Sequence, residues 1–258
     1  MKRILVSALA LLFVLLSFAG CDKRYKKIDV PKELQIDPQA LSENTDEIMD
    51  IDDTTPLLTA LPEQGLYIYY TDRTIRSGVL VKYDGLIQYF PWRFTPERAR
   101  PDVYIADYNG DGEKDIAFTY VYETGATTEC ENLHLLLRNG NKFEDRLYTG
   151  EKASIQCGNH LVVYAEEDGR YIAYLDGEPS EFSLPGHENY IGLDFKHKQD
   201  FTLGETITVE LEPGLMYAQE MKPVYGALDY TARLELTDKD IFQVEPQLTL
   251  AAEETASP

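Results

Sequence analysis

Residue types that often build catalytic centres are scarce in this chain. Its 258 residues include only four histidines, three cysteines and one tryptophan. The sequence contains no Gly-x-Ser-x-Gly elbow, no phosphate-binding loop and no cysteine–histidine arrangement of a nucleophilic enzyme. The histidines also lack the spacing of a zinc site such as His-Glu-x-x-His; they are His134, His160, His187 and His197. These absences favour a protein that is not an enzyme.

Basic residues are also in the minority. The chain has 24 lysines and arginines against 45 aspartates and glutamates, which gives a formal net charge of -21. Such a chain repels nucleic acid and anionic lipid, so we expect no nucleic-acid partner. The acidity instead suits solubility, divalent cations, or a basic or uncharged partner. A facing pair of carboxylates, as glycoside hydrolysis requires, cannot be identified among so many acidic residues.

One long apolar run is present, at the N terminus. Lys2 and Arg3 precede an apolar stretch from Ile4 to Phe18, which ends in Ala19 and Gly20. The stretch is shorter than the roughly 20 residues that cross a bilayer as a helix. This arrangement predicts a secretory signal peptide over residues 1–20, which is removed after export. Its removal changes the formal charge from -21 to -23, because Lys2 and Arg3 are lost.

Cys21 follows the apolar run directly. The sequence Phe18-Ala19-Gly20-Cys21 resembles the lipobox of bacterial lipoproteins, with Phe18 where leucine is usual. The resemblance implies cleavage before a diacylated Cys21 and an extracytoplasmic protein, lipid-anchored to the bacterial cell membrane. Two acyl chains give a durable anchor, whereas one chain holds only marginally. The alternative is an ordinary secreted protein in which Cys21 has no special role.

Two further cysteines remain after lipidation of the first. In an oxidising compartment, Cys130 and Cys157 predict one disulfide, because both border turn-like segments that can approach each other in a sheet. Two buried thiols are the alternative.

The chain changes character near residue 62. Residues 21–61 are polar and contain several prolines, which predicts a flexible spacer after the anchor. Residues 62–247 contain short runs rich in Tyr, Val, Ile, Leu and Phe, separated by Gly, Asn and Asp, as is typical of strands and turns. Residues 248–258 are small and acidic, and we expect a disordered tail.

The expected fold is mainly β, with antiparallel hairpins in a sandwich or an incomplete propeller-like arrangement. Asp84-Gly85 and Asn139-Gly140 are typical of tight hairpin turns. The sequence has no internal repeat of fixed period, which counts against a complete propeller. Few or no helices are expected outside the signal peptide, with one short candidate at residues 95–99. Residues 186–246 are expected to complete the first sheet, although a separate small domain is the alternative.

An aromatic segment runs from Tyr89 to Phe94 and includes the only tryptophan, Trp92. It can be an exposed platform for sugar rings or for a protein partner. The alternative is that these side chains belong to the core, as aromatic residues of strands usually do.

Oxygen-bearing side chains recur at alternate positions from Asp107 to Asp111, after which Gly112 permits a sharp reversal. Ca²⁺ takes six to eight oxygen ligands, and a turning loop with alternating carboxylates can aim several of them at one point. The main-chain carbonyl of Glu113 can add a further ligand. The predicted metal site consists of Asp107, Asn109, Asp111, Glu113 and Asp115.

This loop differs from an EF-hand, because Phe118 stands where a bidentate glutamate is needed. It resembles the calcium-binding hairpin loop of FG-GAP and VCBS-type repeats, whose pattern is Asp, any, Asp or Asn, any, Asp-Gly, two of any, Asp. The longer segment from about Ile105 to Phe143 resembles extracellular lipoproteins of clostridial type. It implies a noncatalytic β module with a structural Ca²⁺. A metal-free turn is the alternative, since Asn, Asp and Gly also favour turns.

The sequence thus predicts a membrane-anchored extracytoplasmic lipoprotein with a calcium-stabilised, β-rich binding or interaction module. Its partners would be the membrane, through the lipid, and a protein or glycan ligand at the cell surface. One alternative is a secreted cell-wall or polysaccharide hydrolase with an unidentified carboxylate pair, and another is a structural or sensor-associated envelope component. The sequence identifies neither the ligand nor the oligomeric state.

Overall fold

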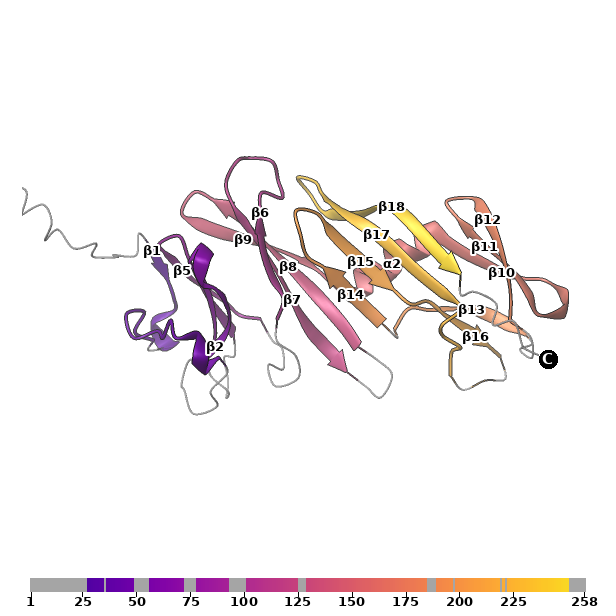
Figure 1. Cartoon of the computed structure of the whole chain (residues 1–258), viewed down its shortest axis with the longest axis horizontal. Coiled ribbons are helices and arrows are strands. Elements are labelled where there is room, and N and C mark those ends of the chain that lie inside the picture. Colours follow the sequence, from indigo (N-terminus) through magenta and orange to yellow (C-terminus); the bar gives the residue numbers. More distant parts are fainter. Residues whose placement is uncertain are drawn as a thin grey trace, which may run out of the picture.

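The computed structural model describes residues 27–34, 36–48, 56–71, 78–92, 101–124, 129–184, 189–196, 198–218, 220 and 222–250. The predicted signal peptide, Cys21, the candidate helix at 95–99 and residues 251–258 lie outside the described residues. The described elements form an elongated molecule, with strands β1–β5 at one end and strands β10–β12 at the other (Figure 1). In the described part of the chain, helices are too short or too polar to cross a membrane.

A five-stranded sheet forms the N-terminal end, in the order β1-β5-β4-β3-β2. The β4–β5 turn places Asp84 and Gly85 at φ 44° and 73°, as the Asp-Gly pair predicts, since a two-residue hairpin turn of this type needs positive φ at both positions. The strands are β1 (Lys27–Asp29), β2 (Leu57–Leu61), β3 (Leu66–Thr71), β4 (Gly78–Tyr83) and β5 (Leu86–Phe90).

Part of the expected spacer belongs to this sheet, which corrects the predicted boundary at residue 61. Strand β1 pairs in parallel with β5, and β2 pairs with β3. Leu41 and Leu57 are buried against the outer face of the sheet. A few apolar residues at the right spacing are enough to dock a polar segment, and its average composition hides them.

The second and larger sheet has the order β18-β17-β15-β14-β8-β7-β6, with β9 also paired to β8. It branches at β8, because β14 pairs only with residues 129–130 and β9 with residues 133–139. Residues 198–211 and 228–250 extend this sheet, whereas residues 190–194 and 214–217 of the same region pair with each other. The strands are β6 (Val103–Ala106), β7 (Asp115–Thr124), β8 (Glu129–Asn139), β9 (Lys142–Tyr148), β14 (Lys198–Thr202), β15 (Ile207–Leu211), β17 (Leu228–Leu236) and β18 (Ile241–Leu250).

Two small sheets and one helix complete the fold. Helix α2 (Gly150–His160) begins after Thr149, whose side chain accepts a hydrogen bond from the Lys152 N–H, and it is the one α-helix in the described ranges. Short 3-10 turns lie at Lys32–Leu34, Thr45–Glu47, Pro62–Gln64 and Glu167–Gly169. The remaining strands are β10 (Leu161–Ala165), β11 (Arg170–Leu175), β12 (Glu178–Ser183), β13 (Tyr190–Asp194) and β16 (Gly214–Tyr217). The fold is mainly β with several antiparallel sheets, and its described part forms no closed propeller, so the predicted fold class is confirmed.

Hydrophobic side chains gather on both faces of the larger sheet. One cluster lies between this sheet and the N-terminal sheet, and it includes Phe90 and Trp92. These two rings stack at 4.8 Å and are 5% and 7% exposed. Phe90 and Trp92 are therefore core and Tyr89 is half-buried, so no exposed aromatic platform is found among the described residues of this segment. Gln88 joins the two sheets through its amide, which donates to the carbonyl and accepts from the N–H of Phe143.

The predicted disulfide is wrong for this structure, in which the described cysteines are not joined to each other. Cys130 lies at the start of β8, where its thiol contacts the Lys196 carbonyl oxygen at 3.6 Å. Cys157 lies on α2 inside the hydrophobic cluster on the other face of the larger sheet, which includes Leu133 and Tyr230, and burial raises the pKa of its thiol. The sequence could not show that the second turn-like segment, Cys157-Gly158-Asn159, is the last turn of a helix.

Candidate functional site: the acidic loop

The acidic loop, residues 107–114, joins β6 to β7. The last paired residues of the hairpin are Ala106 and Asp115, so the segment between them is free of sheet pairing. Gly110 and Gly112 adopt φ 76° and 86°, which only glycine tolerates well. The Asp107 carboxylate accepts hydrogen bonds from three backbone N–H groups, those of Gly110 at 2.8 Å, Asp111 at 3.1 Å and Gly112 at 2.9 Å. These three hydrogen bonds to Asp107 hold the loop in a compact turn.

The other exposed oxygens of the acidic loop lie in the same network. Asn109 Oδ1 accepts from the Asp111 N–H, and Asn109 Nδ2 donates to Asp111 Oδ2, both at 2.9 Å. Asp111 Oδ1 accepts from the Glu113 N–H at 2.7 Å. The Glu113 carboxylate reaches sideways and accepts from the Gly140 N–H in the β8–β9 turn at 3.2 Å. The loop is thus tied to a neighbouring hairpin.

Asp115 is fully buried and anchors the loop from below. Its two oxygens accept from the backbone N–H groups of Tyr108, at 2.9 Å, and Arg138, at 2.7 Å. Burial raises the pKa of this carboxyl, while those backbone bonds oppose the rise. Arg138 also contacts Asp84 in the β4–β5 turn at 3.2 Å. The acidic loop, the β8–β9 turn and the β4–β5 turn therefore meet near Asp115.

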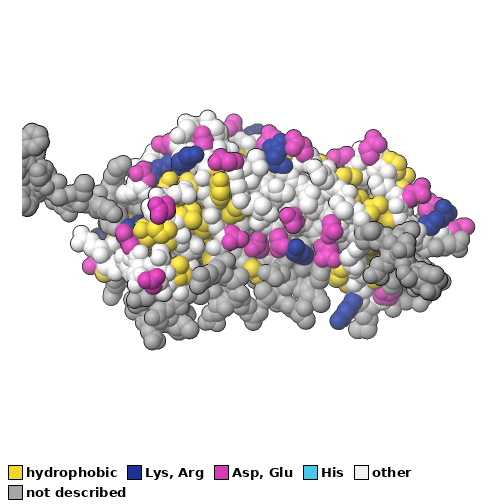
Figure 2. All heavy atoms as spheres, in the orientation of Figure 1, with side chains coloured by type: hydrophobic (Ala, Val, Ile, Leu, Met, Phe, Trp, Pro, Cys, Tyr) yellow, Lys and Arg dark blue, Asp and Glu magenta, His cyan; other side chains and the backbone are white. Residues whose placement is uncertain are grey.

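Among the described residues, the acidic side chains of the loop have no ion-pair partner, and Lys114 is the one cation within the loop itself. In the described part of the chain, no lysine, arginine or histidine forms an ion pair with Asp107, Asp111, Glu113 or Asp115. Acidic side chains are also spread along the whole face of the molecule in Figure 2, with few basic ones between them. Few basic side chains would therefore compete with a bound cation for the carboxylates of this loop.

The donor set can be compared with the needs of a metal ion. A carboxylate has about four lone-pair sites and an amide oxygen two, so Asp107 and Asn109 each keep about one site, and Asp111 and Asp115 each keep about two. Within the described ranges, no three His, Cys, Asp or Glu side chains are already placed to hold a metal. A hard cation such as Ca²⁺ would thus also need the Asn109 amide oxygen and main-chain carbonyls, which the loop provides.

The described histidines take structural roles. His134 Nδ1 lies 2.8 Å from Asp145 Oδ1, and its ring stacks on Trp92 at 3.8 Å. His160 pairs with Asp176 at 2.7 Å. His187 and His197 lie outside the described residues.

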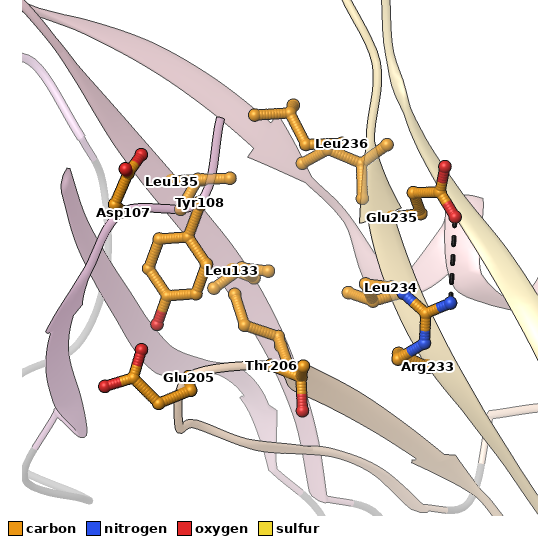
Figure 3. Close-up of a pocket in the computed structure, with 12 residues that line it drawn as sticks. Asp107, Tyr108, Leu133, Leu135, Glu205, Thr206, Arg233, Leu234, Glu235 and Leu236 are labelled. Carbon is orange, nitrogen blue, oxygen red and sulfur yellow. Dashed lines mark ion pairs between the residues drawn. The ribbon is translucent and has the colours of Figure 1, made fainter. Parts of the chain in front are cut away.

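A pocket beside the acidic loop was not foreseen from the sequence. It lies between β8 and strands β15, β17 and β18, with Tyr108 on one wall (Figure 3). Its lining residues come from four distant segments, so no local pattern indicates it.

Comparison with known proteins adds no relative: no family model, no curated protein and no solved structure matches this chain.

Proposed function

We propose that the chain is an extracytoplasmic, lipid-anchored lipoprotein whose β-rich region is a noncatalytic binding module stabilised by Ca²⁺ at the acidic loop. The observation that carries the proposal is the set of oxygen side chains gathered in this loop without a cationic partner among the described residues. Clustered carboxylates repel one another, and a bound cation removes that repulsion. The resemblance of the loop to FG-GAP and VCBS-type repeats supports the same ion.

Calcium at the acidic loop would stabilise more than the loop. Glu113 contacts the β8–β9 turn, and Asp115 holds the Arg138 backbone, whose side chain reaches Asp84 of the N-terminal sheet. Fixing the loop would therefore also fix the junction of the two sheets. The role of the ion is structural, and nothing in it requires catalysis.

The lipid anchor would set how the molecule stands on the membrane. Strand β1 begins at Lys27, so the fold starts six residues after Cys21. Six residues span at most about 20 Å when fully extended. The N-terminal sheet would thus stay near the bilayer, and strands β10–β12, at the other end of the molecule, would point away from it (Figure 1).

The test is a thermal melt of residues 22–258, which keep β1 and β2, with calcium and with excess chelator. We expect the melting temperature to rise with calcium concentration, because a ligand that binds only the folded state stabilises it by about 4 kcal/mol at a thousandfold excess over Kd. Asp111→Ala should abolish this rise, since Asp111 is exposed and its side chain contacts only the loop.

The matched control is Asp238→Ala, an exposed aspartate in the β17–β18 turn. This variant should keep the full calcium response. A wild-type melt that is identical in calcium and in chelator would rule out the calcium part of the proposal.

A further inference from the structure

The pocket beside the acidic loop is lined in about equal parts by mostly buried aliphatic side chains and by more exposed polar ones. Its volume is about 150 Å³. Aliphatic side chains from β8, β15, β17 and β18 line it, namely Leu133, Leu135, Ile207, Leu234, Leu236 and Ile241. An apolar cavity of roughly 150 Å³ can accept a molecule the size of benzene. The interior therefore suits one compact hydrocarbon group.

Tyr108 forms a fixed wall of the pocket. Its hydroxyl donates to the Gly204 carbonyl oxygen at 2.8 Å in the β14–β15 turn, so the ring is held in place. Burial raises the pKa of this phenol, and the ring therefore stays neutral. In Figure 3 the ring lies beside Leu133 and Leu135. A neutral tyrosine ring attracts a cation placed over its face.

The rim of the pocket is acidic. Glu205 is exposed next to the hydroxyl end of Tyr108 (Figure 3), and it has no ion-pair partner among the described residues. On the opposite side Arg233 pairs with Glu235 at 3.7 Å and with Glu245 at 3.1 Å, so its charge is already shared by two carboxylates. An anionic ligand is disfavoured, and a cation is favoured.

We propose that this pocket binds organic cations of the arylalkylammonium type, with the ring in the apolar interior and the ammonium group between Glu205 and the Tyr108 ring. The proposal names a ligand class for the proposed binding function. It rests on that binding function and does not depend on the calcium site. Glu205 supplies the charge, the aliphatic residues supply the apolar contact, and Tyr108 contributes to both.

The test titrates three probes of similar shape into residues 22–258, followed by NMR. The probes are the 2-phenylethylammonium cation, neutral 2-phenylethanol and anionic 3-phenylpropionate. We expect the cation to bind most tightly and the anion least. Glu205→Gln should weaken binding of the cation about two- to fivefold, as expected for loss of one exposed ion pair, and leave the neutral alcohol unchanged.

Two further variants separate this site from nonspecific effects. Thr206→Trp, at an exposed lining position, should block all three probes by covering the pocket, whereas Glu178→Gln on distant β12 should change nothing. Equal binding of cation and alcohol, or an unaltered affinity in Glu205→Gln, overturns the proposal.

The titrations are run both in calcium and in chelator. Cation binding without any calcium-dependent melt would overturn the calcium site and leave the pocket intact. A calcium-dependent melt without cation binding would overturn the pocket alone.

Discussion

Replacing Asp115 with alanine is expected to lower the free energy of unfolding by about 3–5 kcal/mol, because each hydrogen bond to a charged group contributes about 1.5–3 kcal/mol. The substitution leaves the backbone N–H groups of half-buried Tyr108 and buried Arg138 without an acceptor. Urea unfolding in chelator measures the effect without any contribution from calcium. Such a loss would identify Asp115 as the residue that fixes the acidic loop to the larger sheet.

Asp115→Asn is the matched comparison for that experiment. The amide keeps one acceptor oxygen, so only one of the two backbone N–H groups loses its partner, and the loss should be about half as large. If Asp115→Ala unfolds at the same urea concentration as the wild type, the hydrogen bonds of this carboxylate have no net stabilising effect.

Gln243→Leu should be the second most damaging change, with a loss of about 2–4 kcal/mol, because each unsatisfied buried polar group costs about 1–3 kcal/mol. The Gln243 amide donates to the Tyr148 hydroxyl at 3.0 Å and to the Ala153 carbonyl of α2 at 2.9 Å, and it accepts from the Tyr230 hydroxyl at 2.7 Å. Leucine has a similar size but makes none of these bonds. Urea unfolding measures the loss.

Gln247→Leu provides the control for this second experiment. It makes the same chemical change on the same strand, β18, at an exposed position. Its unfolding free energy should stay within about 0.5 kcal/mol of the wild type, as is usual for surface substitutions. Equal losses in the two variants would show that the strand responds to leucine itself, and that the hydrogen bonds of Gln243 are unimportant.

Local chemistry explains what could be predicted. The β4–β5 turn needs two residues that tolerate positive φ, and the Asp84-Gly85 pair in the sequence meets this need. The same holds for the acidic loop, where glycines at positive φ and alternating oxygens place the hairpin between β6 and β7. The predicted site residues between Asp107 and Asp115 do form one connected hydrogen-bonded unit, although whether it binds calcium stays a prediction.

Features that depend on distant contacts could not be predicted. Helix α2 contains two glycines and buries mainly small residues, Ala153 and Cys157, so it has little apolar periodicity. Its stability comes from docking, including the bonds from Gln243 and from Gln199, whose amide donates to the Gly150 carbonyl. The pocket was missed for the same reason, because its walls are brought together only by the folded sheets.

The edge strand of the larger sheet, β18, contains a bulge that affects contacts between copies of the chain. Strand β18 is ten residues long and lies at the end of the sheet, where an unpaired edge can add a strand from another molecule. Glu245 and Pro246 interrupt it as a bulge opposite Ala232, with Glu245 at φ 52° and no N–H on Pro246. A neighbouring molecule cannot continue a regular ladder across this interruption. Wherever molecules of this chain meet at high local concentration, the bulge would keep them from forming a shared sheet and so protect them from aggregation.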